Sequence, residues 1–121
     1  MSRRLLVALA GIAAALAVAG TAFSQAQSIP KLVGTVGPGY TIKLTKAGVK
    51  VRSLKAGMYK FVISDKSSFH NFTLEKETGT KDLTGTSFTG TKTATLTLKR
   101  GTWKYYCSVH EAMMHGFLTV K

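Results

Sequence analysis

From residue 31 onwards, apolar and polar residues alternate along much of the chain with a period of two. Strands that bury one face show this pattern, because successive side chains point to opposite faces of a sheet. The clearest run is 93–98, where threonine occupies every second position and alanine or leucine the positions between. Glycine, asparagine, aspartate and serine separate such runs at short intervals, as turns require. The pattern predicts strands at residues 32–36, 40–44, 49–51, 57–65, 70–74, 93–98, 102–107 and 117–120.

These strands favour an all-β fold. Seven or eight short strands with regularly spaced turn residues predict an antiparallel β-sandwich. Residues 75–90 are rich in Thr, Gly, Lys and Glu, and we expect a loop there with a brief strand or helical turn near Ser87 and Phe88. No long amphipathic helix and no internal repeat is visible. About 95 residues follow the N-terminal segment, enough for one small domain, which we expect at residues 27–121.

Residues 1–26 have the composition of a secretory signal peptide. Arg3 and Arg4 precede an apolar run at 5–19, and small residues follow around 22–26. We therefore expect this segment to be removed from an exported protein, periplasmic or extracellular, with no stable membrane insertion afterwards. An uncleaved anchor is the alternative, because the apolar run is near the lower limit for a spanning helix. The paired arginines leave the Sec and twin-arginine routes both open.

The chain is strongly basic, with 17 lysines and arginines against five acidic residues and a formal net charge of +12. Loss of Arg3 and Arg4 with the signal segment lowers this charge to +10. Such a surface attracts acidic proteins and anionic polymers. Nucleic acid is not an expected partner, because no basic cluster is interleaved with aromatic residues on a predicted face.

Soft metal donors gather near the C-terminal end of the chain. Cys107 is the only cysteine, so it has no partner for an internal disulfide. A lone thiol in an exported protein suggests a specific role, whereas a buried structural cysteine is the alternative. Two histidines, a thiolate and a weak methionine ligand make a blue-copper electron-transfer site. The segment offers Cys107, His110 and nearby methionines, and His70 is the one histidine upstream.

These residues resemble a known family. Cys107-x-x-His110-x-x-x-Met114-x-Gly116 between two predicted strands, with a His-Asn pair at 70–71, is similar to the cupredoxins, especially plastocyanin and amicyanin. The resemblance covers roughly residues 31–121 as a strand pattern. It implies a Greek-key sandwich that binds one type 1 copper ion per chain. The implied metal ligands are His70, Cys107, His110 and Met114.

The resemblance also implies a supporting contact and leaves one ligand open. The Asn71 amide is expected to hydrogen-bond to the backbone near Ser108 and so tie the two ligand loops together. Met114 satisfies the family's Met-x-Gly element, while Met113 and His115 remain alternatives for the axial position. Strand alternation turns Cys107 inward, and His70 is then expected to arrive from the other sheet.

No catalytic set is visible in the sequence. The acidic residues are sparse and unpaired, and no metalloprotease, nucleophile-elbow or phosphate-loop motif occurs. We therefore expect a monomeric electron carrier, not an enzyme, that exchanges single electrons with redox proteins, which its charge suggests are acidic. Copper buffering or delivery is a second hypothesis, and a metal-free sandwich used for adhesion is a third.

Overall fold

The computed structural model describes residues 11, 13–17, 20 and 28–121. Within this part the chain forms ten strands and no helix. None of the described segments is a helix long and apolar enough to cross a membrane. Most of the predicted signal segment, 1–26, lies outside the described residues. The strands are β1 (Lys31–Val36), β2 (Ile42–Lys46), β3 (Val49–Lys50), β4 (Ser53–Leu54), β5 (Gly57–Asp65), β6 (Thr73–Lys76), β7 (Gly79–Asp82), β8 (Gly90–Leu98), β9 (Gly101–Tyr106) and β10 (His115–Val120).

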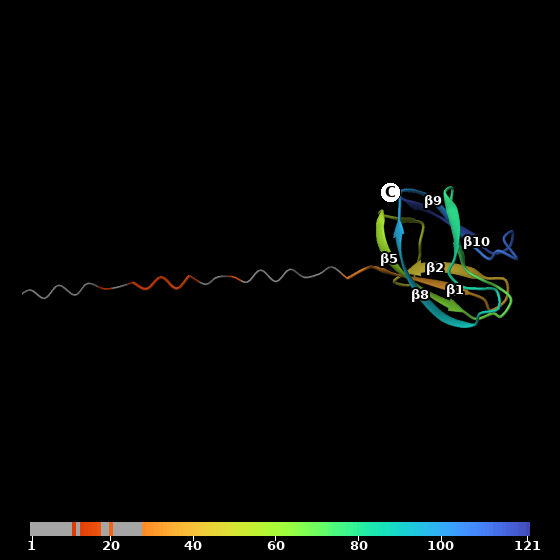
Figure 1. Cartoon of the computed structure of the whole chain (residues 1–121), viewed down its shortest axis with the longest axis horizontal. Coiled ribbons are helices and arrows are strands. Elements are labelled where there is room, and N and C mark those ends of the chain that lie inside the picture. Colours follow the sequence, from red (N-terminus) through yellow and green to blue (C-terminus); the bar gives the residue numbers. More distant parts are fainter. Residues whose placement is uncertain (1–10, 12, 18–19, 21–27) are drawn as a thin grey trace, which may run out of the picture.

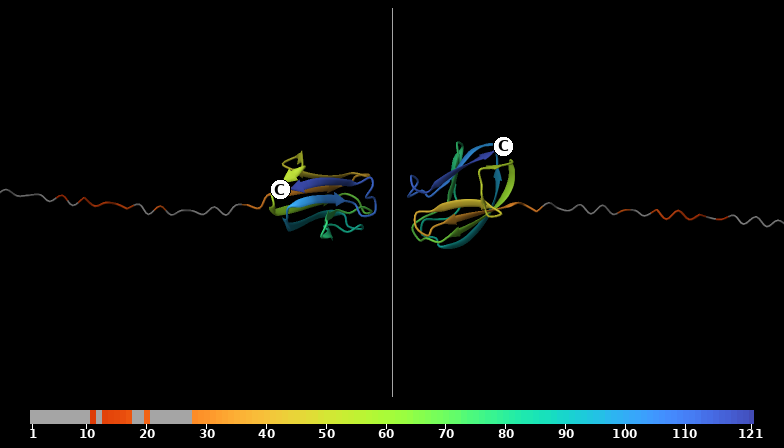
Figure 2. Two further views of the ribbon diagram at one scale, coloured as in Figure 1. Left: turned by 90° about the horizontal axis from the view of Figure 1, so that it is seen from above. Right: turned by 180° about the vertical axis from the view of Figure 1, so that it is seen from behind.

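The strands form two five-stranded sheets that face each other (Figures 1 and 2). Sheet A has the order β3-β2-β1-β5-β8, and sheet B has the order β4-β10-β9-β6-β7. The predicted sandwich is confirmed, but its sheets are mixed and not purely antiparallel. Strand β1 pairs in parallel with β5, and β10 pairs in parallel with the short strand β4.

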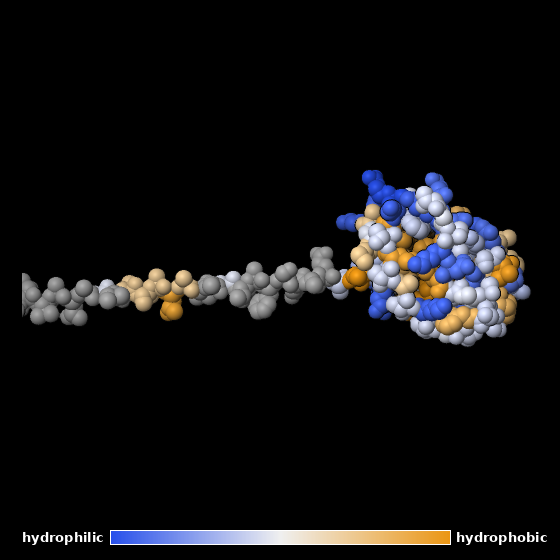
Figure 3. Space-filling view, in the orientation of Figure 1, coloured by the Kyte–Doolittle hydropathy of each residue, from blue (hydrophilic) through white to orange (hydrophobic). Residues whose placement is uncertain are grey.

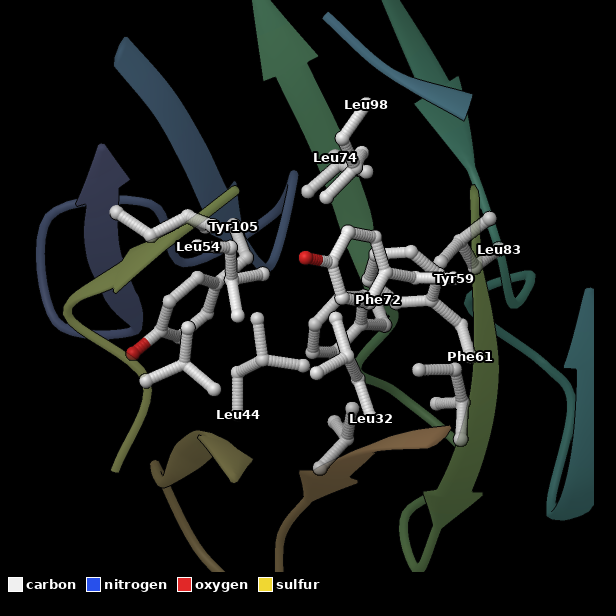
Figure 4. Packing of buried hydrophobic residues seen from close by; sticks show 14 of the residues in the cluster. Leu32, Leu44, Leu54, Tyr59, Phe61, Phe72, Leu74, Leu83, Leu98 and Tyr105 are labelled. Carbon is white, nitrogen blue, oxygen red and sulfur yellow. The ribbon is translucent and has the colours of Figure 1, made fainter. Parts of the chain in front are cut away.

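The core lies between the sheets and is built from the alternate positions of the strands (Figure 4). Tyr59, Phe61 and Ile63 of β5 all point into it, as their spacing predicts. The Phe72 and Tyr105 rings stack across sheet B with centroids 5.8 Å apart. Burying such apolar surface contributes about 25 cal/mol per Å², which makes this the main force holding the sheets together.

The loops that follow β1, β5 and β9 meet at one pole of the sandwich. Figure 1 shows this pole on the right, opposite the end where the described chain enters and where the C-terminus lies. The loops are 37–41, 66–72 and 107–114. Loop 107–114 is the connection between the antiparallel neighbours β9 and β10. Side chains that are far apart in the sequence are thereby brought together at this pole.

The strand predictions hold for most of the chain, and the main differences concern β6, β7 and β8. Strand β8 begins at Gly90, earlier than predicted, because the exposed residues before Thr93 still pair with β5. The 75–90 region contains strand β7, which pairs with β6 as a hairpin although all four of its residues are exposed. Strand β6 begins at Thr73, so His70 lies in the preceding loop and not in a strand.

Candidate metal centre

The turn between β9 and β10 positions three of the four predicted ligands. Cys107 follows the last residue of β9, and its backbone N–H donates to the Met114 carbonyl over 3.0 Å. The His110 N–H donates to the Cys107 carbonyl over 3.2 Å, and the Met114 N–H donates to the His110 carbonyl over 2.9 Å. These bonds fold the segment into a compact turn. The three predicted ligands are therefore held in place by backbone contacts within the loop.

His70 reaches the same place from the connection between β5 of sheet A and β6 of sheet B. The expectation that it comes from the opposite sheet is only half right, because the segment is already crossing to the sheet that carries Cys107. Local turns shape this connection. Asp65 Oδ1 accepts a hydrogen bond of 3.1 Å from the Ser67 N–H, and Ser67 Oγ accepts one of 3.4 Å from the Phe69 N–H.

Three donor atoms from these loops form a small triangle. The Nδ1 atoms of His70 and His110 are 3.0 Å apart, and Cys107 Sγ lies 3.8 Å and 3.9 Å from them. The structure identifies these residues together as a group able to hold a metal ion. The centre of such a triangle lies at about 2.0–2.3 Å from its corners, the range of metal–nitrogen and metal–thiolate bonds. The triangle therefore fits one ion without a change of backbone.

Burial distinguishes the members of the predicted ligand set. His70, Cys107 and Met114 are fully buried, whereas His110 is partly exposed. Met113 is 61% exposed, and His115 is exposed with its Nδ1 2.9 Å from the Glu111 carbonyl. Of the three candidates for the axial position, only Met114 is enclosed with the other donors. Its role as the axial ligand remains a prediction.

The expected contact between the two ligand loops is present. Asn71 Oδ1 accepts a hydrogen bond of 2.7 Å from the Ser108 N–H. Asn71 Nδ2 donates to Thr73 Oγ1 over 3.2 Å, and that hydroxyl donates to Asp82 Oδ1 over 2.7 Å. A chain of hydrogen bonds thus runs from the cysteine loop to strand β7 at the edge of sheet B, and it ties the loop to that sheet.

Two aromatic residues near the site were not recognised in the sequence. The Tyr40 ring lies edge-on to both imidazoles, with centroids 5.3 Å from His70 and 5.0 Å from His110. Phe69 lies 4.2 Å from His70 by the same measure. Phe69 was adjacent to a candidate ligand, but no signal tied Tyr40 to the site, because it belongs to the turn after β1.

These rings also account for how His70 is oriented. Its Nε2 atom is buried and has no hydrogen-bond partner among the described residues. Metal-binding histidines usually donate that second N–H to a fixed acceptor. Here the packing of Tyr40 and Phe69 against the ring takes over the orienting role.

The donor chemistry suits copper. A thiolate with two imidazole nitrogens and a nearby thioether is the set that selects copper in electron-transfer sites. Cys107 is unpaired and buried, so its sulfur is available to a metal and shielded from other thiols.

Comparison with known proteins finds similarity in structure alone. No protein-family model matches the chain, and no curated protein matches it in sequence. The copper protein rusticyanin superposes with a TM-score of 0.56 at 19% identity, over 75% of this chain and 76% of that chain. An oxidized amicyanin mutant gives 0.51 at 13% identity, over 74% and 81%. A chain of a heme-copper terminal oxidase dimer gives 0.53 at 12% identity, over 75% and 63%.

At such identities the likeness establishes the fold, and the chemistry must come from the residues of this chain. The donors at the pole supply it, because a buried cysteine and two histidines converge within 4 Å of one another. The chain has the cupredoxin fold, and its cluster of His70, Cys107 and His110 fits one type 1 copper ion.

Proposed function

We propose that this protein is an exported electron carrier that shuttles single electrons through a type 1 copper site held by His70, Cys107, His110 and Met114. The observation that carries the proposal is the convergence of two histidine nitrogens on a buried cysteine sulfur, on a pole built from three loops. Bound copper would supply reversible one-electron chemistry. The composition of residues 1–26 supports export, and the periplasm or the cell exterior is the proposed location.

The protein's contribution is to hold the donors in one arrangement. Backbone bonds within the 107–114 turn and the Asn71–Ser108 bond restrict how far the donors can move. The sandwich core continues directly beneath them, since Cys107 and Met114 both belong to it. If the donors move little when bound copper changes its oxidation state, the reorganisation energy of electron transfer is small. This favours fast electron exchange over substrate chemistry.

Electrons would enter and leave at the pole. His110 is the one member of the donor triangle that reaches the surface, and exposed apolar side chains surround it. The Tyr40 and Phe69 rings lie edge-on to its imidazole, and the exposed Val109 and Met113 belong to the same loop as His110. Figure 3 shows hydrophobic surface at this end of the molecule. We propose that redox proteins dock on this rim, with the positive charge of the domain attracting acidic partners from a distance.

One observation favours copper handling as a second candidate function. Met113 places an exposed thioether next to the buried Met114. Thioethers bind Cu(I) readily, so Met113 is suited to a transient contact during metal transfer. Fast electron self-exchange by a protein that retains its copper in the presence of a copper chelator would separate the carrier from a delivery protein.

The decisive experiment is a titration of the purified protein with Cu(II), followed by absorption and EPR spectroscopy. We expect one ion per chain and an intense blue band from thiolate-to-copper charge transfer. Cys107→Ser and His110→Ala should lose the band. His115→Ala is the matched control and should keep it, because His115 lies outside the donor triangle. A colourless wild-type protein that binds Cu(II) elsewhere would refute the proposal.

A further inference from the structure

The outer face of sheet A presents basic and hydroxyl side chains. In each strand of sheet A, the side chains that alternate with the core residues point outward. The pairing register of β1, β2, β3, β5 and β8 brings these outward side chains together on one face. Its apolar members are few, chiefly Val33, Val62 and the exposed Met58. The exposed lysines and threonines that share the face are Lys31, Lys43, Lys50, Lys60, Thr91, Thr93, Thr95 and Thr97.

Acidic residues are absent from this face, although the described domain contains all five of the chain. Asp65 ends β5 but is buried and points inward. Glu75 and Asp82 lie on β6 and β7 of sheet B, Glu77 lies in the turn between those strands, and Glu111 lies in the cysteine loop. The two sides of the sandwich therefore differ in charge, and sheet A presents a field of a single sign.

Two features of the face suggest a ligand with repeated negative charges. Lys31 and Lys60 are direct register partners on neighbouring strands. Like charges in such a position repel, so an anion between them would be stabilising. The four threonines of β8 form a straight row along the edge of the sheet, at a spacing of about 6.6–6.8 Å. Hydroxyls at this spacing can donate to successive anionic groups of an extended chain.

The composition of the face disfavours other partners. Protein interfaces are enriched in Tyr, Trp, Phe, Met and Arg and depleted in Lys, whereas this face has no aromatic residue and no arginine. A bilayer surface is also less suitable, because proteins that insert into the interface use Trp, Phe or Leu on the contacting side. A linear hydrated polymer needs neither kind of anchor.

We propose that the outer face of sheet A binds a linear anionic polymer, a polysaccharide bearing sulfate, phosphate or carboxylate groups. The lysines supply charge, and the threonine row on β8 supplies hydrogen-bond donors along the polymer. This face lies on the flank of the sandwich, and the metal-binding pole lies at its end (Figure 2). A polymer on sheet A therefore leaves His110 and its rim free, so the proposal does not depend on the bound metal.

The test uses the purified full-length protein and heparin of defined length as the probe, with affinity measured over a range of salt concentrations. The face variant is Lys31→Gln, Lys43→Gln, Lys50→Gln and Lys60→Gln combined. The matched control combines Lys55→Gln, Lys81→Gln, Lys99→Gln and Lys121→Gln, which removes the same charge from exposed positions elsewhere. We expect the face variant to bind about tenfold more weakly or worse, with a shallower dependence on salt, and the control to lose about threefold or less.

Two further measurements distinguish polymer binding from a pure charge effect and from membrane binding. Thr93→Val combined with Thr95→Val leaves the net charge unchanged and should still weaken heparin binding several-fold. Vesicles that contain an anionic lipid should bind more weakly than heparin. Equal losses in the two lysine variants would show that net charge alone acts and would overturn the proposal. Preferential binding of the vesicles would overturn it in favour of a membrane.

Discussion

Asn71 joins the two loops that carry the metal donors, because its side-chain oxygen accepts a hydrogen bond of 2.7 Å from the Ser108 N–H. Both residues are neighbours of proposed ligands, His70 and Cys107. The bond therefore helps to set the distance between the histidine and cysteine loops. It was expected from family resemblance, and the structure confirms it.

Asn71→Ala should loosen this connection in two ways. It removes the acceptor of the partly buried Ser108 N–H, and a hydrogen bond of this kind contributes about 0.5–1.5 kcal/mol to stability. It also removes the donor to Thr73 Oγ1. We expect a lower free energy of unfolding in urea and a changed copper EPR spectrum. Asn71→Asp keeps the acceptor and should retain more of the native spectrum, so identical spectra for both variants would contradict this role.

Gly116 has a packing role that the sequence did not reveal. The Tyr105 ring lies across it, and a Cβ at position 116 would come within 2.2 Å of the Tyr105 ring and hydroxyl. Gly116→Ala must therefore displace a buried tyrosine, at a cost of about 1–3 kcal/mol. We expect a lower melting temperature by calorimetry. Gly85→Ala is the control, because nothing lies within 4 Å of a Cβ there, and equal effects of the two would show that Tyr105 moves freely.

Local sequence patterns encode those features of the fold that depend on a single strand or turn. Alternation along 102–107 predicts that Cys107 points inward, and Cys107 lies in the core together with Tyr105 of the same strand. The period of two predicts which face a side chain points to, because that direction depends only on the residue's position within its own strand. The ligand spacing is equally local, since three of the four candidates lie in one turn.

Features that depend on distant partners could not be read in the same way. Strand β7 has no buried residue, and it exists because it pairs with β6. The parallel pairing of β1 with β5 follows from the path of the whole chain. Tyr40 reaches the histidines only because the turn after β1 ends at the same pole. None of these contacts leaves a periodic signal in the sequence.

Tyr40 and Phe69 should protect the donor site from water. Each ring contacts both imidazoles with part of its surface exposed to solvent. Tyr40→Ala should open the site, lower the reduction potential by letting water stabilise Cu(II), and slow electron self-exchange. Tyr40→Phe retains the ring and should change neither quantity much. An unchanged potential in Tyr40→Ala, measured by voltammetry, would mean that the ring has no such effect.

Tyr105 should make the fold sensitive to alkaline pH. Burial raises the pKa of its hydroxyl, and Arg52 only partly offsets this rise. The folded state therefore favours the neutral phenol, so the stability it provides is complete below the unfolded pKa of about 10 and falls as the pH rises above it. Urea unfolding should show this loss in the wild type and less of it in Tyr105→Phe. Tyr40→Phe is the control, because its side chain is half exposed, and it should follow the wild type.

Met114 and Met113 differ in whether their side chains are enclosed at the donor site. Met114 is fully buried within the core that includes Cys107, whereas Met113 is 61% exposed. Of the two, only Met114 belongs to the core that encloses Cys107, so we expect it and not Met113 to face the donor triangle. Met114→Leu should keep the blue colour and raise the reduction potential, because a weak donor to Cu(II) is lost.

Met113→Leu is the matched control for that experiment. It replaces the same thioether by the same apolar side chain at the adjacent position, which lies on the exposed rim around His110. We expect it to leave the potential nearly unchanged and to alter the rate of electron exchange with partner proteins, because the rim is the proposed docking surface. A potential shift in Met113→Leu together with none in Met114→Leu would reverse the assignment and make the exposed methionine the axial ligand.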